Sequence, residues 1–446
     1  MFFTQAKSQA RPGAARHLAL AIALATGSVV AMSGVIADPA HAQKKKKKGK
    51  KDYSETFVAA YNPINEALNT EGADPKSVMP QVANLFAASV SADERFLAGN
   101  TAYAIGLKAE DRQMQFDGMK LMLGSGQVGL EQLGQYNFIA FQLARALEVH
   151  DQSRTYLAQA INYNFTTESI NPTIMRIEMS ETFFREDRFK EGLAELKGAI
   201  DANEASGKKV DEAWYRRGLT VAFNNNIQPE VYGFVTDWVA AYPSEKNWRD
   251  AVNITRQLND YGAAETLDIL RLGQRLGTLQ DQIEYLDYVE AADPRRLPQE
   301  VKSVIEAGYA AGVVSRDDIY LSESLQTAKS RIASDRADLP ALERDARASG
   351  AGLRTVMAAG DAFLSYNQMA KAEEFYTKAL GMPGVDRSLA STRLGIAQVE
   401  QGKLTDAKGS FAQVQGSRGP IALLWMSYIE MKSAAAAPAV AALPGA

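Results

Sequence analysis

Apolar residues recur three and four positions apart through most of the chain, from about residue 52 to residue 432. Phe116, Met119 and Leu123 form one such series. This spacing places the apolar side chains on one face of an α-helix, whereas the alternation typical of a half-buried strand is nearly absent. The pattern therefore predicts an all-α protein.

Short turn signals divide the helical pattern into segments that end at glycine, proline or asparagine. They include Gly124-Ser125-Gly126, Asn224-Asn225-Asn226, Asp293-Pro294, Pro383-Gly384 and Gly416-Ser417. Helices joined by links this short lie antiparallel to their neighbours. We expect a series of helical hairpins rather than a single globular bundle.

The clearest repeat spans residues 353–416. Two successive segments that lie 35 residues apart share a glycine in the first helix and a small-x3-aromatic motif in the second. The pattern resembles the tetratricopeptide (TPR) repeat. It is carried by Gly360, Phe363, Ala372, Tyr376 and Ala379, and then by Leu394, Gly395, Ala407 and Phe411. The resemblance implies a right-handed solenoid of antiparallel hairpins, a TPR-like superhelix.

The small residues of the repeat indicate close helix packing. We expect Gly360 and Gly395 to let the two helices of a hairpin approach, and Tyr376 and Phe411 to fill the gap between successive hairpins. A weaker copy upstream contains Trp214 and Gly218, with Phe234 and Pro243 at matching distances.

These patterns divide the chain into six parts. We expect a signal peptide at 1–42 and a lysine-rich disordered segment at 43–52. Degenerate TPR-like hairpins follow at 53–246, and helical hairpins without a clear signature at 247–350. The 142 residues between the repeat unit near 211 and the one near 353 leave room for about four hairpin-sized pieces. Residues 351–432 hold TPR-like repeats with a capping helix that buries Trp425 and Tyr428, and 433–446 form an Ala/Pro-rich disordered tail.

The resemblance also implies a surface for a partner. In TPR arrays the first helices of successive hairpins line a concave face that accepts an extended segment or an amphipathic helix. The corresponding residues, here called the predicted face, are Arg354, Met357, Asp361, Leu364, Leu389, Thr392, Ile396, Val399, Glu400, Ile177, Glu181, Phe184 and Tyr215. The alternative is that several of them simply pack inside a tight superhelix.

The first 42 residues read as an export signal. Lys7, Arg11 and Arg16 precede an uncharged apolar stretch at 18–36, and Ala40-His41-Ala42 offers a small-x-small cleavage site. Cleavage gives a periplasmic or secreted bacterial protein. The alternative is an uncleaved chain anchored in the inner membrane by residues 18–36.

Charge is distributed unevenly along the chain. Residues 1–51 carry ten basic groups and one acidic group, so they sum to +9, and the body from Asp52 onward carries −13. An acidic body makes nucleic acid an unlikely partner. The basic segment is a solvated tether or contacts an anionic surface, through Lys44, Lys45, Lys46, Lys47, Lys48, Lys50 and Lys51.

No residue pattern predicts chemistry. The chain has no cysteine, and after cleavage His150 is the one histidine left, which makes a poor metal site. The G-x-G-x-x-G match at 124–129 follows a helical pattern rather than a strand, so we interpret it as a turn. The S-x-x-K match at 206–209 lacks its companion motifs. We expect no cofactor, no metal and no catalysis.

The sequence thus favours an exported TPR-like scaffold that mediates protein–protein interaction in the bacterial cell envelope. A first alternative is an envelope-surface associating spacer protein that binds through its lysine-rich segment. A second is an all-helical enzyme acting on glycans, with two carboxylates across a cleft, for which pairs such as Glu373-Glu374 and Asp317-Asp318 are too common to discriminate.

Overall fold

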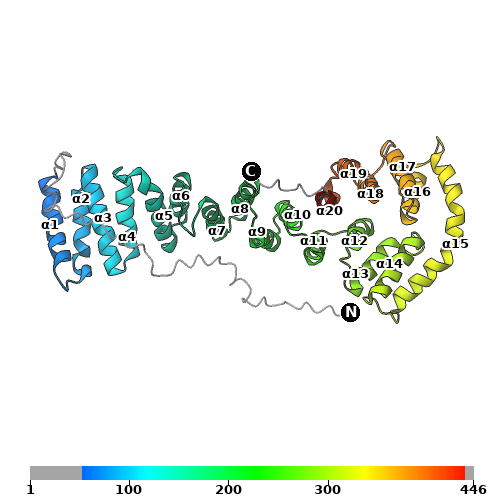
Figure 1. Ribbon diagram of the computed structural model, residues 1–446, viewed down its shortest axis with the longest axis horizontal. Coiled ribbons are helices and arrows are strands. Elements are labelled where there is room, and N and C mark those ends of the chain that lie inside the picture. The colour runs from blue at the N-terminus through cyan, green and yellow to red at the C-terminus, as the bar shows by residue number, and fades with distance from the viewer. Residues whose placement is uncertain (1–52, 437–446) are drawn as a thin grey trace, which may run out of the picture. The chain divides into compact units, whose positions relative to one another are not determined.

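The computed structural model describes residues 53–436, which form twenty α-helices and two short 3-10 helices without any strand (Figure 1). The chain divides into two compact units between Val210 and Asp211. The prediction of an all-α protein is confirmed over this range. The predicted signal peptide, the lysine-rich segment and most of the predicted tail lie outside the described residues.

Unit 1 runs from residue 53 to Val210. Its helices are α1 (Glu55–Asn69), the 3-10 helix η1 (Pro75–Gln81), α2 (Val82–Ala88), α3 (Ala92–Ala109), α4 (Arg112–Gly124), α5 (Leu130–Ala146), α6 (His150–Asn162), α7 (Pro172–Phe184) and α8 (Phe189–Ala205). Each helix contacts the one that follows it, most extensively within the pairs α3–α4, α5–α6 and α7–α8.

Unit 2 runs from Asp211 to residue 436. Its helices are α9 (Glu212–Asn224), α10 (Glu230–Ala241), α11 (Glu245–Gln257), α12 (Ala263–Leu276), α13 (Gln282–Ala292), α14 (Pro298–Ala311), α15 (Ile319–Arg347), α16 (Leu353–Ser365), α17 (Met369–Leu380), α18 (Arg387–Glu400), α19 (Leu404–Phe411), the 3-10 helix η2 (Gly416–Arg418) and α20 (Gly419–Ala436).

One turn geometry joins the two helices of six pairs, and the same geometry also ends α6, α8, α12 and α14. A residue with positive φ follows the first helix, and the next backbone N–H donates to the carbonyl oxygen five positions earlier, which satisfies an orphan carbonyl of the helix end. The donors and acceptors are Asp111 to Gly106, Val149 to Ala144, Arg188 to Phe183, Ile227 to Ala222, Gln368 to Phe363, and Lys403 to Gln398. The same local solution therefore recurs in both units.

Within three pairs of unit 2 a glycine of the first helix faces an aromatic ring of the second. A Cβ on Gly360 would lie 2.6 Å from the Tyr376 ring, and one on Gly395 would lie 2.7 Å from Phe411. Gly218 has the same relation to Phe234, at 2.2 Å. The rings thus occupy the space that the glycines leave inside their own helix pair.

The stretch from residue 211 to residue 353 was expected to hold about four hairpin-sized pieces and contains three helix pairs and one long helix. After α9 and α10, the pairs α11–α12 and α13–α14 are followed by α15, a single helix of 29 residues. No glycine interrupts α15, and its buried side chains lie near its two ends, with none between Ala328 and Leu339. Its first part packs on α13 and α14 and its last part on α16, so it bridges two packed regions within unit 2.

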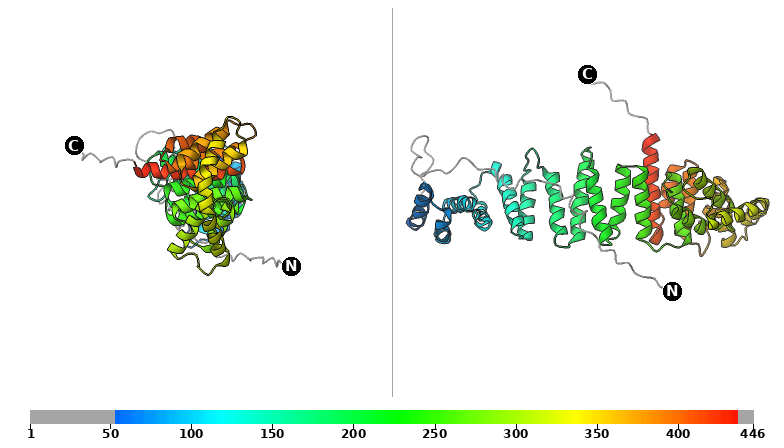
Figure 2. Two further views of the ribbon diagram at one scale, coloured as in Figure 1. Left: turned by 90° about the vertical axis from the view of Figure 1, so that its right-hand side faces the viewer. Right: turned by 90° about the horizontal axis from the view of Figure 1, so that it is seen from below.

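The C-terminal helix α20 returns to the beginning of unit 2. Besides its sequence neighbour α19, it contacts α10, α11, α12 and α18 (Figure 2). Trp425 and Tyr428 are buried, as expected for a capping helix. The helix continues to Ala436, four residues beyond its predicted end, and so takes in the start of the predicted disordered tail.

Candidate functional site

The part of the predicted face that lies on α18 is enclosed. Every residue from Ser391 to Val399 is buried, which means that α18 is covered on all sides. Thr392 is 0% exposed and Ile396 is 3% exposed. These side chains therefore contribute to the interior of unit 2 and not to its surface.

The rest of the predicted face is divided between surface and interior. Arg354 is exposed, whereas Met357, Asp361, Leu389, Glu400 and, in unit 1, Glu181 are partly exposed. Leu364, Val399, Ile177, Phe184 and Tyr215 are buried. The face stays a prediction. On α16, Arg354 and Met357 are accessible to a partner, whereas the carboxylate of the partly exposed Asp361 is bonded to Arg393 and Tyr376.

Asp268 of α12 lies at the centre of the elements that cover α18. Its carboxylate is 0% exposed and accepts hydrogen bonds from Arg271 Nη1 at 2.8 Å, Arg393 Nε at 3.3 Å and Arg418 Nη1 at 2.7 Å. Its backbone carbonyl accepts from Trp425 Nε1 at 3.2 Å. One residue thus joins α12 to α18, to η2 and to α20.

Further carboxylates pair with Arg393 and with Arg271. Arg393 Nη1 donates to both oxygens of Asp361, at 2.6 and 2.8 Å, and Asp361 also accepts from the Tyr376 hydroxyl at 2.8 Å. Arg271 makes a bidentate pair with Glu300, at 2.7 and 2.8 Å. Such pairing is the condition under which buried charges are tolerated.

The arginines also set the protonation state of Asp268. Burial alone raises the pKa of this carboxyl, but the charges of Arg393, Arg271 and Arg418 outweigh burial and hold the pKa below its ordinary value of 3.8. Asp268 is therefore ionised at neutral pH, and its negative charge holds the three guanidinium groups together.

A cavity of about 390 Å³ adjoins this charge cluster. Two ion pairs lie in its wall, Arg271 with Glu300 and Arg275 with Glu400 at 2.8 Å. Burial raises the pKa of the Glu400 carboxyl, and the charge of Arg275 offsets this only in part. The remaining lining residues are Gln274, Tyr288, Ser303, Leu364, Ser365, Asn367, Met369, Ile396 and Trp425.

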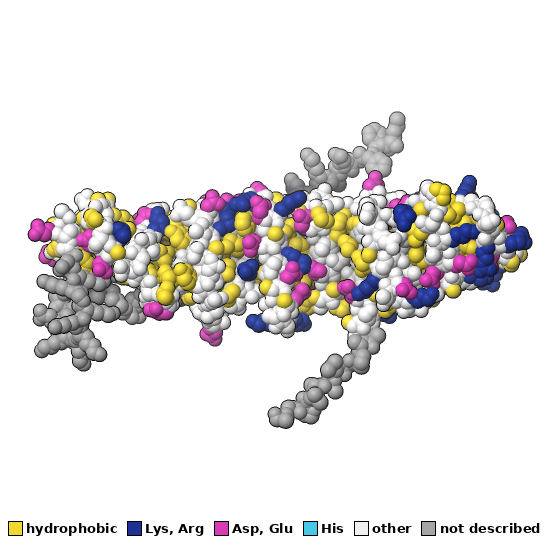
Figure 3. Space-filling model, turned by 90° about the horizontal axis from the view of Figure 1, so that it is seen from above, with side chains coloured by type: hydrophobic (Ala, Val, Ile, Leu, Met, Phe, Trp, Pro, Cys, Tyr) yellow, Lys and Arg dark blue, Asp and Glu magenta, His cyan; other side chains and the backbone are white. Residues whose placement is uncertain are grey.

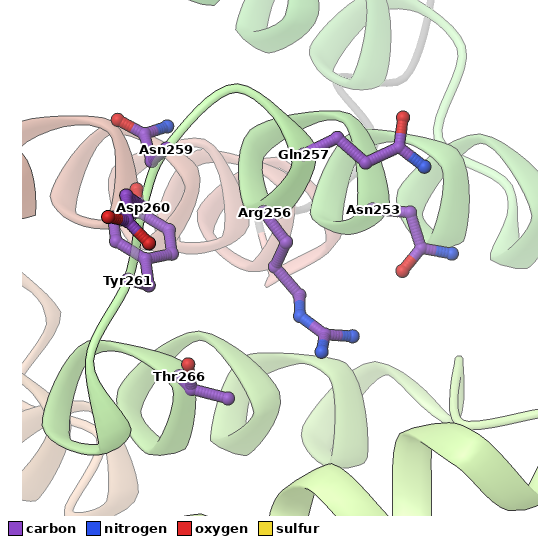
Figure 4. Close-up of a pocket in the computed structure, with 7 residues that line it drawn as sticks. All are labelled: Asn253, Arg256, Gln257, Asn259, Asp260, Tyr261 and Thr266. Atoms are coloured by element: carbon purple, nitrogen blue, oxygen red, sulfur yellow. The ribbon is translucent and has the colours of Figure 1, made fainter. Parts of the chain in front are cut away.

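A second hollow of about 400 Å³ lies between α11 and α12 (Figure 4). Arg256 extends from α11 into it, and Thr266 of α12 lies opposite. The Arg256 guanidinium donates a hydrogen bond to the Asp287 carboxylate, and Asn259 Nδ2 donates one to the Tyr232 hydroxyl at 2.9 Å. Two of its polar side chains thus have partners within unit 2, whereas the buried Tyr261 hydroxyl has no hydrogen-bond partner in the described part of the chain.

No protein-family model matches the chain, and no curated protein matches it. Any assignment of function must therefore rest on the residues and geometry of this chain.

The sequence motifs lie where the helices end. Gly124 ends α4 and Gly126 has a φ of 72°, so the G-x-G-x-x-G match is a turn between α4 and α5. Ser206 caps α8 and His150 begins α6. Within residues 53–436 no three His, Cys, Asp or Glu side chains are grouped to hold a metal ion.

Three of the four carboxylates in the pairs Glu373-Glu374 and Asp317-Asp318 have structural partners. Glu373 accepts from Lys403 Nζ at 2.6 Å, Glu374 pairs with Arg347 at 2.8 Å, and Asp318 caps the start of α15. On the face drawn in Figure 3, acidic and basic side chains are interspersed over the surface of both units. In the described part of the chain, no helix is long and apolar enough to cross a membrane.

Sequence reasoning missed Asp268, Arg271, Arg393 and Arg418. A signal exists for the first two, which lie in the otherwise apolar run Leu267-Asp268-Ile269-Leu270-Arg271-Leu272. Since charged residues are rarely fully buried without a partner, a charge inside such a run indicates a buried pair. The partners more than a hundred positions away leave no comparable local signal.

Proposed function

We propose that the chain is an exported, TPR-like scaffold of the bacterial cell envelope that binds a protein partner without catalysing a reaction. In this proposal both units are stretches of a right-handed solenoid of antiparallel hairpins. The observation that carries it is the recurrence of one turn geometry in six helix pairs. Repetition of one local solution along a chain is the mark of a repeat array.

The glycine–aromatic contacts support the same reading. Gly218, Gly360 and Gly395 each face an aromatic ring sixteen positions later. A small residue and an aromatic residue at fixed positions are what the TPR pattern requires of each repeat. Arrays of this kind usually present extended surfaces to other proteins.

The enclosure of α18 restricts where the partner binds. Thr392 and Ile396 are engaged inside unit 2, so the partner contacts the accessible part of the predicted face on α16, around Arg354 and Met357. An exposed cation next to a partly exposed thioether offers both a charge and an adaptable apolar contact.

Site-specific photo-crosslinking tests the proposal. A photoreactive residue is placed at Arg354 or Met357, and as matched controls at Ala370 or Thr377, which are exposed on α17. We expect a protein adduct of one discrete mass from the first pair and not from the controls. No adduct from the first pair, or equal adducts from all four positions, would contradict the proposal.

Export is part of the proposal and has its own test. Mass spectrometry of the chain isolated from its native host is expected to find Gln43 as the first residue. An intact Met1 would instead favour an anchored chain. Deletion of residues 44–51, followed by salt-dependent sedimentation with anionic vesicles, tests whether the lysine-rich segment binds an anionic surface.

A further inference from the structure

Exposed apolar side chains gather where α13 and α15 begin. Ile283, the second residue of α13, is 67% exposed. Ile319 and Tyr320, the first two residues of α15, are 73% and 45% exposed. Single apolar residues scattered over a surface are ordinary, whereas several in one place indicate a contact surface.

The starts of these two helices are held side by side. Gln282 Nε2 donates to Asp318 Oδ2 at 2.7 Å, so the residues that precede Ile283 and Ile319 are bonded to each other. Leu286 is partly exposed and lies one turn after Ile283 on the same face of α13. The side chains of this surface, here called the apolar patch, are Ile283, Leu286, Ile319 and Tyr320.

Acidic side chains lie beside the apolar patch. Burial and the negative charges of Glu290 and Asp293 raise the pKa of the Tyr320 hydroxyl, so both carboxylates are close enough to act on it. Glu323 is exposed one turn after Tyr320 on α15. Within the described part of the chain neither Glu290 nor Glu323 has an ion-pair partner. A partner that covers the apolar patch therefore meets unpaired negative charge and is favoured if it is basic.

We propose that the apolar patch, with Glu290 and Glu323, is a docking surface for a basic amphipathic helix of a partner protein. The apolar face of that helix covers Ile283 and Ile319, and its lysine or arginine side chains pair with the two glutamates. Residues 53–436 contain no strand, so an extended segment finds no sheet edge here, whereas a helix satisfies its own backbone hydrogen bonds. The surface lies on other helices than α16, so its test is independent of the crosslinks expected there.

Fluorescence anisotropy with the full chain tests this surface. The probe is a labelled helical peptide of leucine and lysine in amphipathic order. One counterpart has glutamate in place of lysine, and another has the same residues in scrambled order. We expect saturable binding of the amphipathic leucine–lysine peptide alone, weakening as the salt concentration rises. Failure of this peptide to saturate, or equal binding of all three peptides, would overturn the proposal.

Ile319→Ser is the diagnostic variant and Leu130→Ser its matched control. Ile319 is the first residue of α15 and Leu130, which is 80% exposed, is the first residue of α5, so neither change disturbs the interior. Ile319→Ser is expected to weaken peptide binding about tenfold, and Leu130→Ser to leave it unchanged. Equal effects of the two variants would show that the peptide binds elsewhere and would contradict the assignment.

Two further outcomes concern the charges and the identity of the occupant. Glu290→Gln should weaken binding of the leucine–lysine peptide and make it less dependent on salt, because one attractive charge is removed. An unchanged salt dependence would contradict the part given to the glutamates. A dimer of the free chain that Ile319→Ser dissociates would assign the apolar patch to a second copy and would overturn the proposal.

Discussion

Arg418 Nη1 donates a 2.7 Å hydrogen bond to Asp268 Oδ2, although the two residues lie 150 positions apart in the chain. Arg418 ends the short helix η2 that leads into α20, and Asp268 lies in the middle of α12. The pair therefore fixes the entry of the C-terminal helix against the first half of unit 2. We call this contact between the two ends of unit 2 the closure of the unit. With the unit closed, a large part of α18 lies in the interior of the protein.

Replacing Asp268 should destabilise unit 2 strongly. In Asp268→Asn the buried guanidinium groups of Arg271, Arg393 and Arg418 lose a shared negative charge, and breaking a buried pair costs about 3–5 kcal/mol. Urea denaturation followed by circular dichroism measures the loss. The exposed pair of Lys246 and Asp250 is the control, because Asp250→Asn should cost at most about 1 kcal/mol. Similar losses in the two variants would contradict the role given to Asp268.

The glycine–aromatic contact predicts opposite effects for two glycines in one helix pair. Gly395→Ala places a Cβ 2.7 Å from the Phe411 ring, and we expect a loss of about 1–3 kcal/mol from this overpacking. Gly409 lies on the partner helix α19 with open space around it, so Gly409→Ala should stabilise the helix by about 0.5–1 kcal/mol. Thermal unfolding of both variants measures the difference, and the same sign for both would refute the packing described.

The positive φ in the recurring turn predicts how substitutions at that position change the stability of the protein. Gly402 has a φ of 74° in the α18–α19 turn, so Gly402→Ala should destabilise the protein by about 1–2 kcal/mol. Glu148 occupies the equivalent position between α5 and α6 with a φ of 59°, and Glu148→Gly should stabilise by up to about 1 kcal/mol. Chemical denaturation of the two variants checks the signs, which are expected to be opposite.

The helices and their close contacts could be predicted from the sequence, because residues near one another in the chain determine them. The spacing of Phe116, Met119 and Leu123 predicts a helix, and α4 contains all three. Gly360 and Gly395 each lie against an aromatic ring of the paired helix, Tyr376 and Phe411 respectively, and the Phe411 ring also stacks on Trp425 of α20. Trp425 and Tyr428 were correctly placed on the buried side of the last helix.

The closure of unit 2 could not be predicted from the sequence in the same way. Arg393 looks like a surface residue of an amphipathic helix, because its partner Asp268 is 125 positions away. Contacts between residues this far apart depend on the total rotation that accumulates from one helix to the next along the chain. The sequence of a single turn does not determine that total. The predicted face therefore included Thr392 and Ile396, which are buried inside unit 2.

Glu94 links the start of α1 to the start of α3 and predicts a dependence of stability on pH. It is 2% exposed and accepts backbone N–H bonds from Ser54 at 2.7 Å, Ser91 at 2.7 Å and Val90 at 3.0 Å. Burial raises the pKa of its carboxyl, but these hydrogen bonds outweigh burial and lower it to about 2. Its stabilising effect is therefore fully present above the ordinary pKa of 4.5 and is lost as the pH falls toward 2.

The variant Glu94→Gln tests this dependence. It removes the charge from these bonds and should cost unit 1 about 1.5–3 kcal/mol at neutral pH. The difference in the free energy of unfolding between wild type and variant should shrink between pH 4.5 and pH 2, the range set by the two pKa values. Glu66→Gln is the control, because Glu66 is an exposed residue of α1 in the same unit. A difference for Glu94→Gln that stays constant over this range would show that the carboxylate charge is not what stabilises the junction.

The closure of unit 2 around α18 is the central claim, and cysteine labelling tests it most directly because the chain has no cysteine of its own. Single variants Thr392→Cys and Arg354→Cys are treated with a thiol reagent under native conditions, after circular dichroism has shown equal helix content. Thr392 is 0% exposed and Arg354 is exposed. The thiol of Thr392→Cys should therefore react only on unfolding, and that of Arg354→Cys at the rate of a free thiol. Equal native reactivity of the two variants would show that the face of α18 is open and would contradict the closure by Asp268 and α20.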